Sequence, residues 1–557
     1  MESLDLTDAK FTNVQHLPIA KEYARQIKLT QTIDSMVESQ MELSPGVAVL
    51  AMVLDTLTGR TPLYRLVNFY RKKDGELLLG KPVAPELFSD HNLGRVLDKI
   101  YETGTQKIFG QLAQNAVGGF QIDTQCGHYD TTSMSVFGDY NLVEKPFHIT
   151  YGHSKDKRPD LKQFLIEMLC VDRNIPILGA TRDGNGSDKT LNNELLGGVS
   201  RYMSKNGLKN DAYIHVADAA MVTKKNLEMA DLRKILFVSR LPANFNECRR
   251  AIEQAVARDQ WEDLGTLNQT PSTRKRPAAF YRTFEATVKI NERVYRAIVV
   301  HSSAHDKRKH KRIDRSLKKE RKELTKICKD AMATAYFCRA DAQIAEQKLC
   351  ALAESSECYR ISTTIEKGAK YKRGRPAKGR EREVDHYEYV LKASIVENAE
   401  KVKTLRSEAG CFVLLTNLIS DEQSHEWNAG RLLRLYKNQS GIEQNFGFLK
   451  DPAIVNGIFL KKTTRIEVLG LILLIALLIW RLMERAMRQF TQPDGSTLPG
   501  WEKRRTKRPT SFMMTTKFTD VLVITIGNVR RLANRFTTNQ LAYLEALRVN
   551  PDVFVIP

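Results

Sequence analysis

The 557-residue sequence is poor in the patterns that mark metal-binding, disulfide-bonded or membrane proteins. Its eight cysteines form no C-x-x-C pair, and none of its eleven histidines belongs to an H-E-x-x-H motif. Zinc sites and disulfide frameworks normally carry such spacings, so we expect neither. The longest apolar run, Val468–Trp480, has thirteen residues, whereas a helix that crosses a bilayer needs ~20. The run predicts a buried core helix, and we expect no membrane partner.

The sequence also opens without the pattern of a secretory leader, and it contains fewer acidic than basic residues. The chain opens with the polar stretch MESLDLTDAK rather than with basic and then apolar residues, which predicts a cytoplasmic protein. Only 65 Asp and Glu face 86 Lys and Arg, leaving a net charge of +21. This excess favours a polyanionic partner such as nucleic acid, although a basic protein can also be merely soluble.

The remaining composition is that of a globular protein, with 42% apolar and 27% charged residues. Apolar residues spaced by three and four predict helices near the N-terminus, and strand-like runs separated by Gly, Asn and Pro begin near residue 118. We therefore predict an α/β protein of five segments. These are a helical domain (1–117), the first part of an α/β core (118–240), an inserted basic domain of strands and helices (241–405), the second part of the core (406–490), and a basic loop with a helical tail (491–557).

Two aspartates stand out on the predicted strands. Asp130 lies in the strand-like run His128–Val136, and Asp218 ends the apolar run Ala212–Ala217. A buried carboxylate is costly unless it binds a metal or has polar partners. Asp183 is the alternative to Asp218. Its Gly and Asn neighbours predict a turn, however, in which an aspartate side chain usually accepts a hydrogen bond from the local backbone. Glu397 and Glu400 lie on a polar stretch and are interpreted as solvated.

A third acid lies on a predicted helix, Leu432–Leu449. At ~100° per residue, Tyr436, Glu443 and Lys450 share one face, and Gln439 lies beside them. The stripe combines a hydroxyl, an amide, a carboxylate and an ammonium, a set suited to holding a metal and the phosphates around it. Solvent exposure alone is the competing interpretation.

This spacing resembles the Y-x2-R-x3-E-x6-K signature of bacterial insertion-sequence transposases of the DDE class. Three of the four positions match, and Gln439 stands where the signature has arginine. The segments around Asp130 and Asp218 and the stretch Tyr151–Gln163 are also similar to the family. The resemblance implies a ribonuclease H-like core, with the inserted domain lying between the second acid and Glu443.

The resemblance further implies a cut-and-paste mechanism. Asp130, Asp218 and Glu443 would hold two Mg²⁺ ions, for which Mn²⁺ can substitute, while Tyr436, Gln439 and Lys450 would contact DNA. Two such ions activate water or a 3′-hydroxyl and stabilise the charge that develops on the phosphate. The implied partners are the terminal inverted repeats of the element, target DNA and a second copy of the chain, at the bacterial nucleoid.

Basic segments account for the charge excess. Ten of the sixteen residues from Lys307 to Lys322 are Lys or Arg, a density suited to contacting phosphates, unless the helix is merely solvated. The stretch Arg373-Gly-Arg-Pro resembles an AT-hook, whose arginines enter a narrow minor groove. The residues that we expect to bind DNA here are Lys307, Arg308, Lys309, Lys311, Arg312, Arg373, Arg375, Arg504 and Arg505.

Other functions remain open at this stage. A ribonuclease H-like nuclease or junction resolvase would use the same acids without strand transfer, and a non-catalytic DNA-binding protein would keep only the basic segments. The N-terminal helical domain is where we expect the element's ends to be recognised. There, a helix over His91–Tyr101 would place His91, Asn92 and Arg95 in a major groove, unless its apolar side simply packs.

Overall fold

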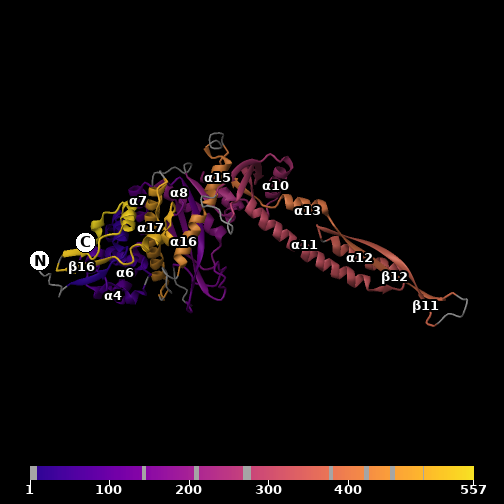
Figure 1. The fold of residues 1–557 in the computed structure, drawn as a ribbon, viewed down its shortest axis with the longest axis horizontal. Helices are drawn as coiled ribbons and strands as arrows, with labels where there is room; N and C mark the ends of the chain where they lie inside the picture. Colours follow the sequence, from indigo (N-terminus) through magenta and orange to yellow (C-terminus); the bar gives the residue numbers. More distant parts are fainter. Residues whose placement is uncertain are drawn as a thin grey trace. The chain divides into compact units, whose positions relative to one another are not determined.

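The computed structural model describes residues 9–59, 61–140, 146–205, 213–267, 277–354, 356–374, 381–419, 426–451, 458, 460–492, 495–527 and 529–557. The chain forms two compact units (Figure 1). The first unit contains Met1–Ser239 and Leu435–Pro557, and the second contains Arg240–Arg434. Both combine helices and strands, which confirms the predicted α/β class.

The first unit contains a mixed sheet with the strand order β4-β3-β2-β5-β6. Strand β3 pairs antiparallel with β2 and β4, whereas β5 runs parallel to both β2 and β6. Nine of the ten residues of β3 are buried, as expected for an apolar strand covered on both faces. The strand bounds are β2 (Cys126–Val136), β3 (Lys162–Val171), β4 (Ile175–Arg182), β5 (Ile214–Ala217) and β6 (Leu236–Arg240).

Helices surround this sheet. Those before it are α1 (Leu17–Gln26), α2 (Leu29–Met36), α3 (Pro45–Thr56), α4 (Leu66–Arg71), α5 (Gly75–Leu79), α6 (Asp90–Thr103) and α7 (Thr105–Phe120). Within and after it come α8 (Asp188–Lys205), α9 (Lys224–Leu232), α16 (Ser440–Lys450) and α17 (Thr463–Thr491). Side chains cap α3 and α6 at their N-termini, since Ser44 accepts from the N–H of Val47 and Ser89 from that of Asn92.

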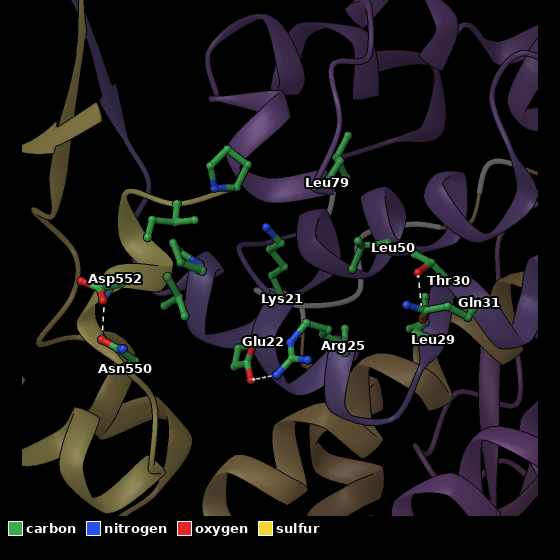
Figure 2. A pocket seen from close by; sticks show the side chains of 16 residues that line it. Lys21, Glu22, Arg25, Leu29, Thr30, Gln31, Leu50, Leu79, Asn550 and Asp552 are labelled. Carbon is green, nitrogen blue, oxygen red and sulfur yellow. Dashed lines mark hydrogen bonds and ion pairs between the residues drawn. The ribbon is translucent and has the colours of Figure 1, made fainter. Parts of the chain in front are cut away.

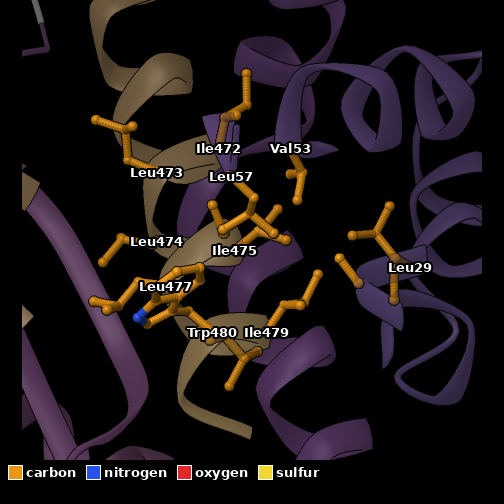
Figure 3. Close-up of a cluster of buried hydrophobic side chains, with 14 of the residues drawn as sticks. Leu29, Val53, Leu57, Ile472, Leu473, Leu474, Ile475, Leu477, Ile479 and Trp480 are labelled. Atoms are coloured by element: carbon orange, nitrogen blue, oxygen red, sulfur yellow. The ribbon is translucent and has the colours of Figure 1, made fainter. Parts of the chain in front are cut away.

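Helix α17 forms the centre of the hydrophobic core. Residues Ile472 to Trp480 pack with Leu29, Val53 and Leu57 of the N-terminal region, as Figure 3 shows. By length and composition this helix is apolar enough to cross a membrane, but 94% of its most apolar window is buried inside the protein. The run Val468–Trp480 is therefore a core helix in this structure, as predicted.

The first unit also contains a small sheet that the sequence patterns did not indicate. Strand β1 (Lys10–Asn13) pairs with β16 (Leu522–Ile526), which pairs with β17 (Val529–Leu532). The C-terminal segment therefore contains strands as well as α18 (Ser511–Thr515) and α19 (Thr538–Leu547). It shares one core cluster with the N-terminal helices.

The second unit contains an antiparallel run of strands in the order β13-β9-β8-β7. It also contains a long helix, α11, packed with α12 and a two-stranded hairpin, β11–β12. These elements run alongside one another in Figure 1. The bounds are α10 (Asn246–Arg258), β7 (Glu262–Thr266), β8 (Phe280–Ile290), β9 (Arg293–Ser302), α11 (Ser303–Met332), β10 (Ala335–Tyr336), α12 (Arg339–Glu354), β11 (Tyr359–Tyr371), β12 (Val384–Glu397), α13 (Ala399–Ser407) and β13 (Cys411–Thr416).

The second unit and the predicted insert have different bounds. The compact unit runs from Arg240 to Arg434, whereas the predicted insert covers 241–405. The cause is β13, which pairs antiparallel with β9 of the same unit. The predicted helix Leu432–Leu449 is interrupted at Asn438–Gln439, so that α15 (Ala429–Lys437) ends before α16 begins.

Candidate active site

Asp130 and Asp218 lie side by side at the centre of the first unit's sheet. Strands β2 and β5 are parallel, and His128 pairs with Val216 at an offset of 88 residues. The same offset places Asp218, the residue after β5, beside Asp130. Aligned residues on neighbouring parallel strands project from the same face, so the two carboxylates face one site. The structure thus brings together two of the three predicted acids.

The surroundings of both carboxyl groups oppose ionisation. The pKa of Asp130 is raised to about 6, mainly by burial and to a smaller extent by the negative charges of Asp218 and Asp188, against the lowering effects of Lys155 and the Thr131 backbone N–H. Burial also raises the pKa of Asp218, with an added contribution from Asp188. Clustered carboxylates with raised pKa values are typical of functional sites. A bound cation would relieve this repulsion.

The positive charge present at the site belongs to Lys155. Its Nζ lies 3.5 Å from Oδ1 of Asp130 and 3.6 Å from Oδ2 of Asp188. It also donates to the carbonyl of Thr131 at 2.6 Å, while the Thr131 hydroxyl donates to Oδ1 of Asp188 at 2.6 Å. Lys155 therefore partly neutralises two carboxylates and is fixed to β2.

Sequence reasoning missed both Lys155 and Asp188. Lys155 lies within the family-like stretch Tyr151–Gln163, but nothing in its neighbours indicates a carboxylate partner. Asp188 occupies the first turn of α8, where an acid is favoured by the helix dipole in any protein. A weak signal was available, since Asp188 follows the Gly- and Asn-rich turn after β4.

Helix α16 covers the sheet face from which Asp130 projects. Asp130 pairs with Met168 across β2 and β3, so their side chains share a face. Asn445 of α16 donates to Sδ of Met168 at 3.5 Å and to the carbonyl of Asn174 at 2.8 Å. Arg481 of α17 in turn donates to Oδ1 of Asn445 at 2.7 Å. The position of α16 is therefore fixed by buried polar contacts.

Glu443 and Lys450 lie seven residues apart on α16, as predicted. Lys450 pairs with Asp156 at 2.5 Å, next to Lys155 in the chain. Glu443 lies on the exposed side of the helix, and within the described part of the chain its carboxylate makes no hydrogen bond or ion pair. The structure places Glu443 on the helix above the aspartates but does not bring its carboxylate into contact with them.

The predicted single stripe over Tyr436, Gln439, Glu443 and Lys450 is wrong, because the helix is broken. Tyr436 belongs to α15, and Gln439 is the residue before α16, where its side chain makes no capping hydrogen bond. Gly441 allows the chain to pack closely here, since a Cβ at this position would lie 2.6 Å from the carbonyl oxygen of Arg173. The first turn of α16 packs directly against the turn after β3.

The rival acids have other roles. The carboxylate of Asp183 accepts from the backbone N–H of His148 at 2.7 Å, which supports its interpretation as a turn residue, although the partner is not its own local backbone. Glu397 and Glu400 are exposed, as predicted.

The predicted DNA-contacting side chains of the second unit are exposed. Lys307, Arg308, Lys309, Lys311 and Arg312 lie on α11. Arg373 follows β11 and is exposed, whereas Arg375 lies outside the described residues.

The two C-terminal arginines have local partners. Arg504 lies 3.8 Å from Glu502. Nε of Arg505 donates to the hydroxyl of Thr497 at 2.7 Å, across the short pair of β14 (Leu498–Pro499) and β15 (Arg505–Thr506). Arg505 therefore stabilises this turn.

The apolar side of α6 packs into the protein core, which agrees with the alternative interpretation of the helix predicted over His91–Tyr101. Leu93, Val96, Leu97 and Ile100 are fully buried, and Asp98 pairs with Arg465 of α17 at 2.8 Å. The side-chain amide of Asn92 donates to the carbonyl of Leu87. His91 and Arg95 remain exposed.

The carboxylates at the site are suited to a hard divalent cation, because Mg²⁺ binds oxygen ligands and retains water. Asp130 and Asp218 supply such oxygens in a partly buried setting. Among the residues that the structure describes, no group of three or more His, Cys, Asp or Glu side chains is close enough to hold a metal. Two carboxylates are therefore what the described arrangement offers.

Two cavities of the first unit have linings that include none of the predicted site residues. The one in Figure 2 is lined by Lys21 and Arg25 of α1 and by Asn550 and Asp552 near the C-terminus. Arg25 is held by Glu22 at 2.7 Å. A second cavity, behind the sheet, is lined by Glu167 and Arg182, which pair at 2.7 Å.

Comparison with known proteins gives one partial match. Residues 9–114 match a family described as a domain of unknown function, DUF4277. The matched region spans β1 and most of the helices before the sheet, and it ends close to the predicted boundary at residue 117. No curated protein matches the chain.

Proposed function

We propose that this chain is a DDE-type transposase that binds the terminal inverted repeats of its own insertion sequence, cleaves there and transfers the 3′-ends to target DNA. The observation that carries the proposal is the alignment of Asp130 and Asp218 on adjacent parallel strands. A ribonuclease H-like core is supported by the sheet, in which three antiparallel strands are joined through β2 to two parallel ones. The two aspartates lie where the antiparallel and parallel halves meet.

Asp130 and Asp218 would hold Mg²⁺, and Mn²⁺ would substitute for it. When bound, the metal polarises a phosphate oxygen and lowers the pKa of water. The fit rests on the raised pKa values of both carboxyl groups, since they leave an unmet demand for positive charge. Glu443 is proposed as the third acid, carried by the helix that covers the same face and contributing to the second ion of the predicted pair.

The residues around the two aspartates are proposed to position the carboxylates and to neutralise charge on the carboxylates and on bound DNA. Lys155 holds Asp130 and Asp188 in place through one ammonium group. Lys450, already paired with Asp156, lies at the far end of α16 from Glu443 and is suited to contacting a phosphate when DNA binds. Tyr436 and Gln439, at the break before α16, are proposed to contact the same DNA strand.

Double-stranded DNA is the proposed partner, and the paired ends of an element require at least two copies of the chain. Basic residues of the second unit would contact phosphates without reading sequence. Recognition of the terminal repeats is assigned to the N-terminal region, where His91 and Arg95 of α6 are exposed. The bacterial nucleoid is the proposed location.

The proposal is tested by incubating the full-length protein with Mg²⁺ and a DNA fragment that carries the sequences flanking its own gene. We expect cuts at the inverted repeats and joining of the released 3′-ends to a second DNA. Cleavage without joining would identify a nuclease or resolvase instead. Binding without cleavage in Mg²⁺ or Mn²⁺ would identify a non-catalytic DNA-binding protein.

A further inference from the structure

Helix α11 carries a continuous row of cations along one side. Seven cations follow one another at steps of four, four, three, four, four and three residues: Lys307, Lys311, Arg315, Lys318, Lys322, Lys326 and Lys329. At ~100° per residue these steps keep all seven within a sector of ~100°. We call this set the basic ridge. All seven residues are exposed.

The opposite side of α11 faces the rest of the second unit. Leu317, Leu324 and Cys328 are its buried residues. Leu317 and Leu324 belong to a small core with Tyr359 of β11 and Val402 of α13, and the Tyr359 hydroxyl donates to the carbonyl of Leu317 at 3.2 Å. The basic ridge is therefore directed away from the elements that hold the helix.

The acidic residues of α11 lie off the ridge. Asp314 pairs with Arg406 of α13 at 3.2 Å, and Glu323 lies 3.9 Å from Lys319. Among the residues that the structure describes, none of the seven ridge cations forms an ion pair. A row of uncompensated charges is costly because like charges repel, and a polyanion relieves that cost.

We propose that the basic ridge is a phosphate track for duplex DNA. From Lys307 to Lys329 the helix rises ~33 Å at 1.5 Å per residue, close to one turn of B-DNA at ~34 Å. The inference rests on the proposed function, in which DNA is the partner, and specifies which residues of α11 contact the DNA phosphates. Of the residues predicted from sequence, Lys307 and Lys311 belong to the ridge. Lys309 and Arg312 instead line a cavity beside α10.

The test compares two full-length variants with the same loss of charge. The first is Lys311→Gln/Lys318→Gln/Lys322→Gln, on the ridge. The matched control is Lys309→Gln/Arg312→Gln/Arg321→Gln, on the flanks of the same helix. All six positions are exposed, and circular dichroism checks that both variants fold. The measurement is the Kd for a random-sequence duplex from low to physiological salt, by fluorescence anisotropy.

For the ridge variant, we expect the slope of log K against log salt to fall by about 2.7, at ~0.9 for each lost phosphate contact. The slope of the control variant should differ from that of the wild type by no more than ~0.9, the value for one phosphate contact. Equal losses in both variants, or no loss in either, would overturn the inference. Retained DNA binding with loss of binding to phosphatidylserine vesicles would overturn it in favour of an anionic membrane.

The outcome is separable from that of the proposed function. An Asp130→Ala variant measured in parallel should bind DNA with the wild-type slope and fail to cleave it. Lost cleavage in this variant, together with an unchanged slope in the ridge variant, would leave the catalytic proposal standing and remove only the phosphate track.

Discussion

Asp130 and Asp218 are neighbours across two parallel strands, although 88 residues separate them in the chain. Each carboxyl group is partly buried, and the charge of Asp218 raises the pKa of Asp130. Two acids are thus held together at an electrostatic cost to the folded state. Such a cost is typical of functional sites, and we propose that a divalent cation completes this one.

The first prediction concerns the pH dependence of stability in the metal-free protein. The pKa of Asp130 is raised from 3.8 to about 6, so the folded protein holds this proton more tightly than the unfolded chain. The protonated Asp130 therefore contributes to the free energy of unfolding below pH 4. This contribution falls as the pH rises to about 6 and is absent above it. Asp130→Asn removes the ionisation and should raise the free energy of unfolding by about 2 kcal/mol at pH 7.5.

Urea unfolding in EDTA at pH 4 and pH 7.5 checks this prediction. Near pH 4 the variant and the wild type should have the same stability, because Asp130 is protonated in the folded protein. A variant less stable than wild type at pH 7.5 would contradict the assigned pKa.

The second prediction concerns Lys155, whose ammonium lies 3.5 Å from Asp130 and 3.6 Å from Asp188. Lys155→Met removes a cation that repels any metal bound to Asp130. Mg²⁺ should then bind on the order of tenfold more tightly, measured by isothermal titration calorimetry. Lys157→Met, in the same loop, is the control. Weaker Mg²⁺ binding in Lys155→Met would show that the lysine supports the site instead.

The third prediction uses two glycines of α16. A Cβ at Gly441 would lie 2.6 Å from the carbonyl oxygen of Arg173, whereas one at Gly447 would meet nothing within 4 Å. Gly441→Ala should displace the first turn, which carries Glu443, and lower DNA cleavage at least tenfold. Gly447→Ala should keep full cleavage and gain up to about 1 kcal/mol of stability from helix propensity. Equal cleavage by both variants would mean that the placement of Glu443 is unimportant.

The fourth prediction concerns the buried contacts between α16 and α17. Arg481 donates to Asn445 and pairs with Glu484 at 3.1 Å, and both charged side chains are at most 6% exposed. Arg481→Met removes one of the two cations that pair with the buried Glu484, the other being Arg488 at 2.5 Å, and should cost about 2 kcal/mol of unfolding free energy in urea. Adding Glu484→Gln should restore part of that loss. A double variant less stable than the sum of the two single changes would contradict the pairing.

Part of the fold was predictable from local patterns. The strand-like run His128–Val136 lies within β2, and the apolar run Val468–Trp480 lies within α17. The break at Asn438–Gln439 was not predictable from periodicity, since the apolar residues keep a helical spacing through it. Just after the break, Gly441 packs closely on Arg173, a contact between residues far apart in the sequence.

In the candidate site, too, some residues were predictable from the sequence and others depend on contacts that only the fold creates. Asp130 was identified through the resemblance of its segment to the transposase family, and Asp218 through the same resemblance and because it ends an apolar run. Lys155 and Asp188 were missed because their importance comes from the fold, which brings a loop lysine and a helix-terminal acid to β2. The pairing of β1 with β16 is likewise a contact between opposite ends of the chain and has no local signal.

The most direct test of the central claim is Mg²⁺-dependent cleavage by three single variants, with DNA binding measured in parallel. Asp130→Ala and Asp218→Ala should lose cleavage by on the order of a thousandfold or more, because each removes a metal ligand, and both should still bind DNA. Asp183→Ala, which loses only a turn contact to His148, should retain cleavage. Full cleavage by Asp218→Ala together with an inactive Asp183→Ala would contradict the account.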